Sequence, residues 1–265
     1  MLIVSTEDSD IITQIQEAEN MEVHPHSHSH GKKNWKSYVW EFLMLFLAVF
    51  CGFLAEYQLE HTIEHNREKE FIISMIEDVQ TDTSTVKKEI EQNKKQLRLI
   101  DSLATFCFNY DITKKSDYDI YRLYRGVLSS SAAVKPTERT LVQLKNSGGM
   151  RLLRKKAAVD MIILYDGSGK EVLFRQEISG IMNKECINVA FELMNFSYYN
   201  PGTYRGISQS AELLSHDRVK LIHFGNRITT YGASLTVYGQ CLQRMNDDGI
   251  KLISTLRKEY HLMDK

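Results

Sequence analysis

Proline and glycine are scarce in this chain, since its 265 residues include only three prolines and 14 glycines. Short strands joined by tight turns depend on these residues, so a many-stranded sandwich or barrel is not expected. The four cysteines lie far apart and form no C-x-x-C pair, which argues against a zinc knuckle or a thioredoxin-type site. The formal net charge of -1 provides no field that would attract DNA or RNA, and we expect no nucleic-acid partner.

One long apolar run is present, "YVWEFLMLFLAVFCGFLAEY", and it predicts a single transmembrane helix over residues 37–57. From Val39 to Ala55 only Glu41 is charged. A helix of that length spans roughly 25 Å, which is just enough to cross the hydrocarbon core of a bilayer. Aromatic residues flank the run, as at a membrane interface: Trp35, Tyr38, Trp40 and Tyr57. We therefore expect the lipid bilayer to be a partner of this chain.

The distribution of charge on the two sides of the run predicts an orientation. Lys32, Lys33 and Lys36 precede the run, whereas acidic residues dominate directly after Tyr57. Because positively charged loops stay on the cytoplasmic side, we expect a single-pass protein of a bacterial inner membrane. Residues 1–36 would then form a disordered, histidine-rich cytoplasmic tail, and residues 58–265 a periplasmic helical domain.

The amino-terminal tail contains alternating histidines, His24, His26, His28 and His30, separated by Pro and Ser. In an extended chain this spacing puts four imidazoles on one side, where they could gather Zn, Ni or Cu weakly. The alternative is a solvated tail without a metal-related role, because a histidine-rich tract is a compositional signal and defines no coordination geometry. We expect no other cofactor.

The segment after Tyr57 contains no proline or glycine until Gly126, and it predicts one long helix, followed after Cys107 by a loop and a second helix capped by Ser116. Apolar residues recur there with heptad spacing for more than four heptads, which indicates packing along a partner helix. The pattern fits an intramolecular bundle and a parallel dimer equally well. The two rows are Ile72, Val79, Val86, Asn93 and Ile100, and Ile76, Thr83, Ile90, Leu97 and Ala104.

The stretch "EHTIEH", residues 60–65, contains His61-x-x-Glu64-His65, the spacing of one class of zinc peptidase motif. His61 and His65 lie one helical turn apart and could share a metal, with Glu64 as a base. Zinc needs a third protein ligand, and the sequence singles none out. The competing interpretation is a polar helix that leaves the membrane, and it is the one we prefer. We expect no enzyme, and a metal-dependent hydrolase is the most distant alternative.

The remaining sequence also predicts helices. One lies over residues 136–147, and a second covers residues 150–165 before a possible break at "DGSGK". A third covers residues 170–196, and a fourth covers residues 215–262 with kinks at one or more of its glycines. The stretch "NFSYYNPGTYRG" predicts a loop. Five tyrosines could line a pocket or belong to the core: Tyr198, Tyr199, Tyr204, Tyr231 and Tyr238.

Three stretches resemble a family of uncharacterised single-pass membrane proteins of Bacteroidetes-type bacteria. They are "HPHSHSHGKKNWKSYVWEFLMLFLAVFCGFLAE", "EHTIEHNREKEF" and "TLVQLKNSGGMRLL". The resemblance covers roughly residues 22–165. It implies a short amino-terminal tail, one membrane helix and a helical extracytoplasmic domain, and it transfers no activity and no site residue.

These observations favour an all-α protein in which a single transmembrane helix continues into a long helix of an extracytoplasmic bundle. We expect a membrane-anchored, non-enzymatic protein for protein interaction, oligomerisation or envelope organisation. Its partner would be a second copy or another envelope protein. The alternative is an extracytoplasmic domain that senses a ligand or handles metal.

Overall fold

The computed structural model describes residues 34–113, 116–129, 133–200 and 206–262, and the regular elements in these ranges are helices. No strand forms there, and two isolated antiparallel bridges are the only extended pairings. The predicted all-α class is therefore confirmed. The helices are α2 (Trp35–Phe108), α3 (Tyr118–Ser129), α4 (Arg139–Asn146), α5 (Lys156–Leu193) and α6 (Arg218–Glu259), with short 3-10 turns η1 (Gly149–Arg151) and η2 (Phe196–Tyr198).

Contacts divide the chain into two units, residues 1–59 and residues 60–265. The described part of the first unit is the beginning of α2. Its large apolar side chains are exposed, and an 18-residue window has a mean hydropathy of 2.0. A helix that is apolar on every face needs an apolar surrounding. In the described part of the chain this is the one helix long and apolar enough to cross a membrane.

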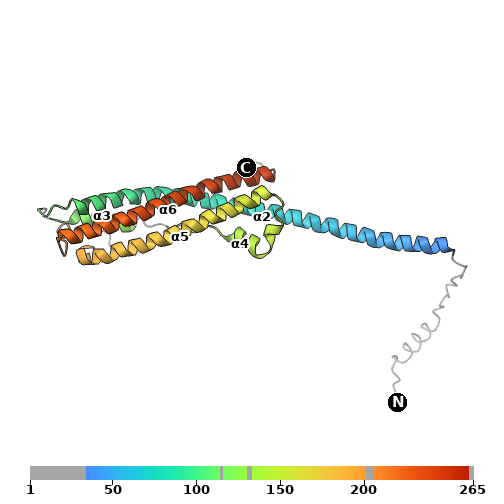
Figure 1. Cartoon of the computed structure of the whole chain (residues 1–265), viewed down its shortest axis with the longest axis horizontal. Helices are drawn as coiled ribbons and strands as arrows, with labels where there is room; N and C mark the ends of the chain where they lie inside the picture. The colour runs from blue at the N-terminus through green and yellow to red at the C-terminus, as the bar shows by residue number, and fades with distance from the viewer. Residues whose placement is uncertain (1–33, 114–115, 130–132, 201–205, 263–265) are drawn as a thin grey trace, which may run out of the picture. The chain divides into compact units, whose positions relative to one another are not determined.

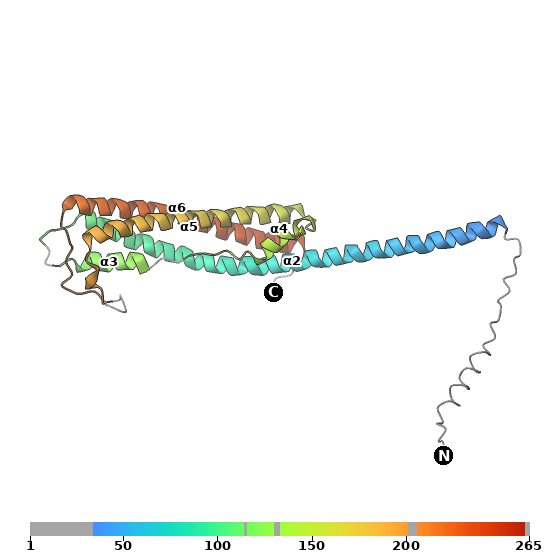
Figure 2. The ribbon, with the colours of Figure 1, turned by 90° about the horizontal axis from the view of Figure 1, so that it is seen from below.

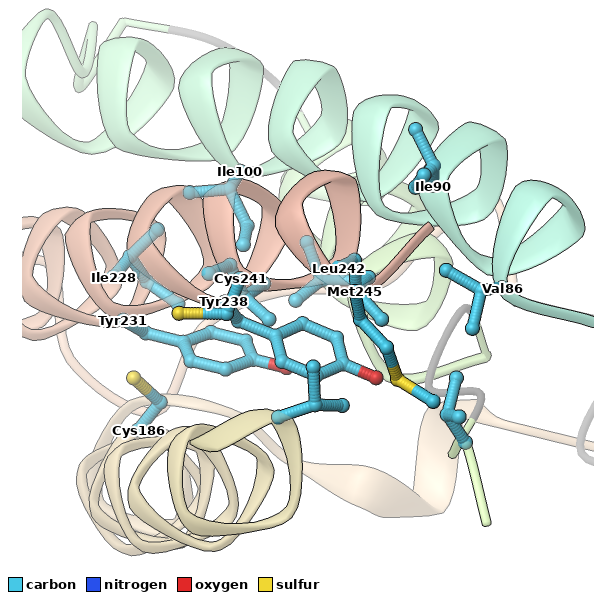
Figure 3. Packing of buried hydrophobic residues seen from close by; sticks show 14 of the residues in the cluster. Val86, Ile90, Ile100, Cys186, Ile228, Tyr231, Tyr238, Cys241, Leu242 and Met245 are labelled. Atoms are coloured by element: carbon cyan, nitrogen blue, oxygen red, sulfur yellow. The ribbon is translucent and has the colours of Figure 1, made fainter. Parts of the chain in front are cut away.

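The second unit is a bundle built from the rest of α2 together with α3, α5 and α6, with α4 packed at one end (Figures 1 and 2). Buried side chains from α2, α5 and α6 meet in one core, in which Ile90 and Ile100 of α2 face Ile228, Tyr238 and Leu242 of α6 (Figure 3). The heptad rows of α2 thus pack against helices of the same chain. Of the two arrangements that the sequence allowed, the structure has the intramolecular bundle.

The glycines of α6 form its contact surface with α2. An added Cβ at Gly232 would lie 2.8 Å from Cγ2 of Ile100, and one at Gly239 would meet the side-chain amide of Asn93. Gly225 faces Cys107 and Gly249 faces Thr83 in the same way. Seven residues forward along α6 correspond to seven residues backward along α2, so the two helices are antiparallel and in heptad register. The predicted kinks at these glycines are wrong, since α6 is one helix whose glycines allow close approach.

Helix α5 is also longer than the sequence predicts. It runs through "DGSGK" without a break, because this stretch is packed: Gly169 lies against Pro136 and Met245, and the Ser168 hydroxyl donates to the carbonyl of Tyr165. Such tertiary packing outweighs the weak helix propensity of two glycines. The predicted start at residue 150 is wrong too, because residues 149–151 form the 3-10 turn η1 after Gly148, which has a φ of +69°.

A buried carboxylate fastens the segment between α5 and α6 to the bundle. Asp117 accepts hydrogen bonds from the Tyr110 hydroxyl at 2.5 Å, the Leu213 amide at 2.7 Å and His216 Nε2 at 2.9 Å. Beside it, Tyr199 donates to the carbonyl of Tyr121 at 3.0 Å. This end of the bundle is therefore held by side chains that span about a hundred residues of sequence.

Candidate functional site

A third row of residues on α2 is buried beside the row that begins at Ile72, and most of its members are polar. The row follows the same heptad spacing and consists of Glu68, Met75, Asp82, Glu89, Gln96 and Leu103. A buried polar group costs free energy unless a partner satisfies it. We call Glu68, Asp82, Glu89 and Gln96 the polar row.

Each member of the polar row is bonded to a tyrosine. Glu68 accepts from the Tyr260 hydroxyl at 2.6 Å, and Asp82 accepts from the Tyr165 hydroxyl at 2.9 Å. Gln96 donates to the Tyr231 hydroxyl at 2.9 Å. Glu89 is hydrogen-bonded to Tyr238. Tyrosine combines a large apolar ring with one polar atom, so these pairs fill the core and satisfy the buried groups together.

The polar row also binds backbone groups of other segments. The Asp82 carboxylate accepts from the Thr137 amide at 2.9 Å, and the neighbouring Asp78 accepts from the Thr140 amide at 3.1 Å. No side chain of its own segment caps α4, so α2 supplies the acceptors at the amino end of that helix. Glu68 likewise accepts from the Arg154 amide at 2.8 Å, just before α5 begins.

Glu89 lines a small cavity between α2, α5 and α6. The cavity has a volume of about 60 Å³ and is lined by polar atoms of Gln96, Gln176 and Ser179 together with Tyr238. The Ser179 hydroxyl there is buried without a protein partner. This volume has room for about two water molecules, well below the size of an organic ligand site.

Burial controls the ionisation of Glu89, whose side chain is only 7% exposed. Loss of hydration raises the pKa of its carboxyl from 4.5 to about 7, and the hydrogen bond from Tyr238 opposes that rise only in part. The carboxyl therefore changes charge near neutral pH inside a closed core. It is the most strongly perturbed carboxyl among the described residues.

A larger pocket lies at the end of the second unit where α2 enters it. Its volume is about 600 Å³, and we call it the basal pocket. Buried Glu68 forms part of its wall, with Tyr260 beside it. The lining residues are His61, Thr62, His65, Glu68, Lys69, Arg154, Lys155, Glu259, Tyr260 and His261.

The structure places His61 and His65 on α2 at the wall of the basal pocket. The Arg154 side chain lies where a metal ion bound to His61 and Glu64 would have to lie. Its guanidinium lies 2.8 Å from His61 Nε2 and donates to Glu64 at 3.1 Å. Because a guanidinium is always protonated, His61 Nε2 is the acceptor and its lone pair faces a cation. No group of three or more metal-ligating side chains occurs within the described ranges.

The other residues singled out from the sequence are separated by the fold. His24, His26, His28, His30 and Tyr204 lie outside the described residues. Tyr231 and Tyr238 line the small cavity, whereas Tyr198 and Tyr199 pack against Tyr121 in an aromatic cluster. The predicted five-tyrosine pocket is therefore two separate groups, as far as the described tyrosines show.

Sequence reasoning missed the polar row and Arg154. The polar row carries a detectable signal, since Asp82, Glu89 and Gln96 follow each other at intervals of seven beside an apolar row with the same spacing. Arg154 carries none, because its partner His61 is 93 residues away. Comparison of the chain with protein-family models, with curated proteins and with solved structures gives no match.

Proposed function

We propose that this chain is a membrane-anchored, non-enzymatic protein whose helical bundle binds another protein through the outer face of α5. The apolar start of α2 supports the anchor, and exposed apolar residues on α5 support the interaction. The partner is a second copy of the chain or another envelope protein. The residues of the H-x-x-E-H motif support no catalytic role, because Arg154 engages both His61 and Glu64.

The observation that carries the proposal is a line of large apolar side chains on the solvent side of α5. Ile163 is 57% exposed, Phe174 54% and Ile181 47%. They are 11 and seven residues apart, close to whole numbers of helical turns, so they share one face. Buried residues such as Val172 lie on the inner side of α5, and Figure 1 shows the helix along the edge of the bundle. We call these three residues the α5 stripe.

An aligned apolar face of this kind is typical of a binding surface. Single exposed apolar residues are common on any protein, but three that share one helical face, with Lys170 and Glu177 between them, form a row that a partner would remove from water. The interior of the bundle supports recognition of an organic ligand less well, because the cavity beside Glu89 holds only about two waters.

The location that we propose is a bacterial inner membrane, with residues 1–36 in the cytoplasm and the bundle in the periplasm. Lys32, Lys33 and Lys36 before the apolar run support this orientation. The bundle would then meet partners in the envelope.

The proposal is tested by the particle mass of the full chain in detergent, measured by mass-resolved chromatography. We expect the wild-type chain to run as an oligomer or with a bound partner. Phe174→Ser combined with Ile181→Ser should run as a single chain with unchanged helix content. Ile73→Ser combined with Ile250→Ser is the matched control, since these residues are also exposed but lie on α2 and α6. A wild-type chain that is monomeric and free of other proteins would contradict the proposal.

A further inference from the structure

The basal pocket lies next to the predicted membrane surface in the sequence. His61 in its wall is only four residues after Tyr57, the aromatic residue that follows the apolar run. These four residues belong to α2, and four helical residues rise about 6 Å along the helix axis. The polar headgroup layer begins where the hydrocarbon core ends and is roughly 5 to 7 Å thick on each side. The pocket is therefore within reach of lipid headgroups if α2 is the anchor.

Its lining has ammonium groups without partners. Lys69 and Lys155 form no ion pair in the described part of the chain, whereas Arg154 is already bonded to His61 and Glu64. The two lining carboxylates differ. Glu68 is 2% exposed and already accepts from the Arg154 amide and the Tyr260 hydroxyl, so it is closed to a ligand. Glu259, the second carboxylate of the lining, belongs to the last turn of α6.

The surroundings add further positive charge. Lys156 follows Lys155 directly, and α5, which begins there, has no acidic residue in its first turn and no side-chain cap. Helices usually have acidic residues at this end, because the exposed amide groups carry partial positive charge. His65 and His261 in the lining add ring N–H donors for an acceptor-rich ligand. A phosphate group, with several acceptor oxygens and a negative charge, matches this set.

We propose that the basal pocket binds the phosphate-bearing headgroup of an anionic phospholipid, with Lys69 and Lys155 donating to the phosphate oxygens. This rests on the membrane anchoring in the proposed function. Such binding would fix the position of the bundle at the bilayer surface by contacts in addition to the apolar helix. About 600 Å³ is sufficient for a headgroup.

The test uses the full chain in dodecyl maltoside, a detergent without phosphate, and follows thermal unfolding by circular dichroism. We expect dioctanoyl phosphatidylglycerol to raise Tm by roughly 5 °C when it is in hundredfold excess over Kd. Dioctanoylglycerol, which lacks the phosphate, should leave Tm unchanged. Lys69→Ala combined with Lys155→Ala should abolish the rise, and the matched control Lys87→Ala with Lys88→Ala should keep it, because those two exposed lysines lie elsewhere on α2.

Three results would overturn the inference. They are no rise in the wild-type chain, an equal rise in the pocket variant, and an equal rise with inorganic phosphate, which would indicate a soluble ligand. Flotation of the full chain with vesicles tests the anchor separately. A chain that floats but shows no lipid-dependent rise contradicts only the headgroup site, whereas a chain that does not float contradicts the anchor as well.

Discussion

At the scale of single residues, Glu89 has the most unusual environment in the bundle. It is a carboxyl in a closed core, bonded to Tyr238 and next to a cavity of about 60 Å³. Its pKa of about 7 in the folded chain exceeds its ordinary value of 4.5. Between these pH values the Glu89 carboxyl of the folded chain holds a proton that the unfolded chain has lost, so the contribution of Glu89 to the free energy of unfolding falls as pH rises from about 4.5 to 7.

We predict that Glu89→Gln removes this pH dependence. The free energy of unfolding of the variant, relative to wild type, should increase by roughly 3 kcal/mol between pH 4.5 and pH 8. Urea unfolding at several pH values measures the difference. Glu177→Gln is the control, because Glu177 is exposed on α5 and should leave the pH profile of the wild-type chain unchanged. Parallel profiles for wild type and Glu89→Gln would show that Glu89 is hydrated in solution.

His61 and Glu64 show how a short motif changes meaning in a fold. Their spacing is that of a metal site, yet the residue that meets them is Arg154, 93 and 90 residues away. No residue within or beside the motif indicates whether a metal ion or an arginine will contact it. The distinction depends on which end of α5 meets α2, and that is a property of the whole bundle.

At the scale of elements, the contact between α2 and α6 depends on four glycines, three of which are seven residues apart. Gly232 is the most informative, since the atom nearest to an added Cβ belongs to Ile100, which is buried and β-branched. A β-branched side chain has little freedom to move away. We predict that Gly232→Ala lowers the free energy of unfolding by about 1 to 2 kcal/mol, because overpacking outweighs the gain in helix propensity.

Gly167→Ala is the matched control for that prediction. Gly167 is exposed in the middle of α5, and an added Cβ there would meet nothing within 4 Å. The substitution should raise the free energy of unfolding by roughly 0.5 to 1 kcal/mol through helix propensity alone. Denaturant midpoints of both variants measure the contrast. If both alanines stabilise the bundle equally, the two helices are not in the close contact described above.

Much of the helical pattern could be predicted from the sequence, and the exceptions have physical causes. The apolar rows of α2 were visible because hydrophobic periodicity is local. The glycines of α6 suggested kinks and the "DGSGK" stretch of α5 suggested a break, because propensity alone takes no account of a neighbouring helix. The polar row was not predicted, since its burial depends on tyrosines that are 83 to 192 residues further along the chain for Asp82, Gln96 and Glu68.

At the scale of the whole molecule, the polar row and its tyrosines fix which helices meet and in what register. A core that was only apolar would tolerate sliding by one heptad, whereas a shift here would separate buried polar groups from their partners. With the interior occupied in this way, the surfaces are left for recognition. The α5 stripe and the basal pocket are the two surfaces for which we propose partners.

The most direct test of the proposed interaction is photo-crosslinking of the full chain in cells. A photoreactive amino acid is placed at position 174 or 181 of the α5 stripe, or at the exposed control positions 73 and 250. We predict a discrete crosslinked species, either a dimer or a complex with one envelope protein, from positions 174 and 181 only. The absence of a crosslink from the stripe, or equal crosslinking from all four positions, would contradict the claim that this face of α5 binds a partner.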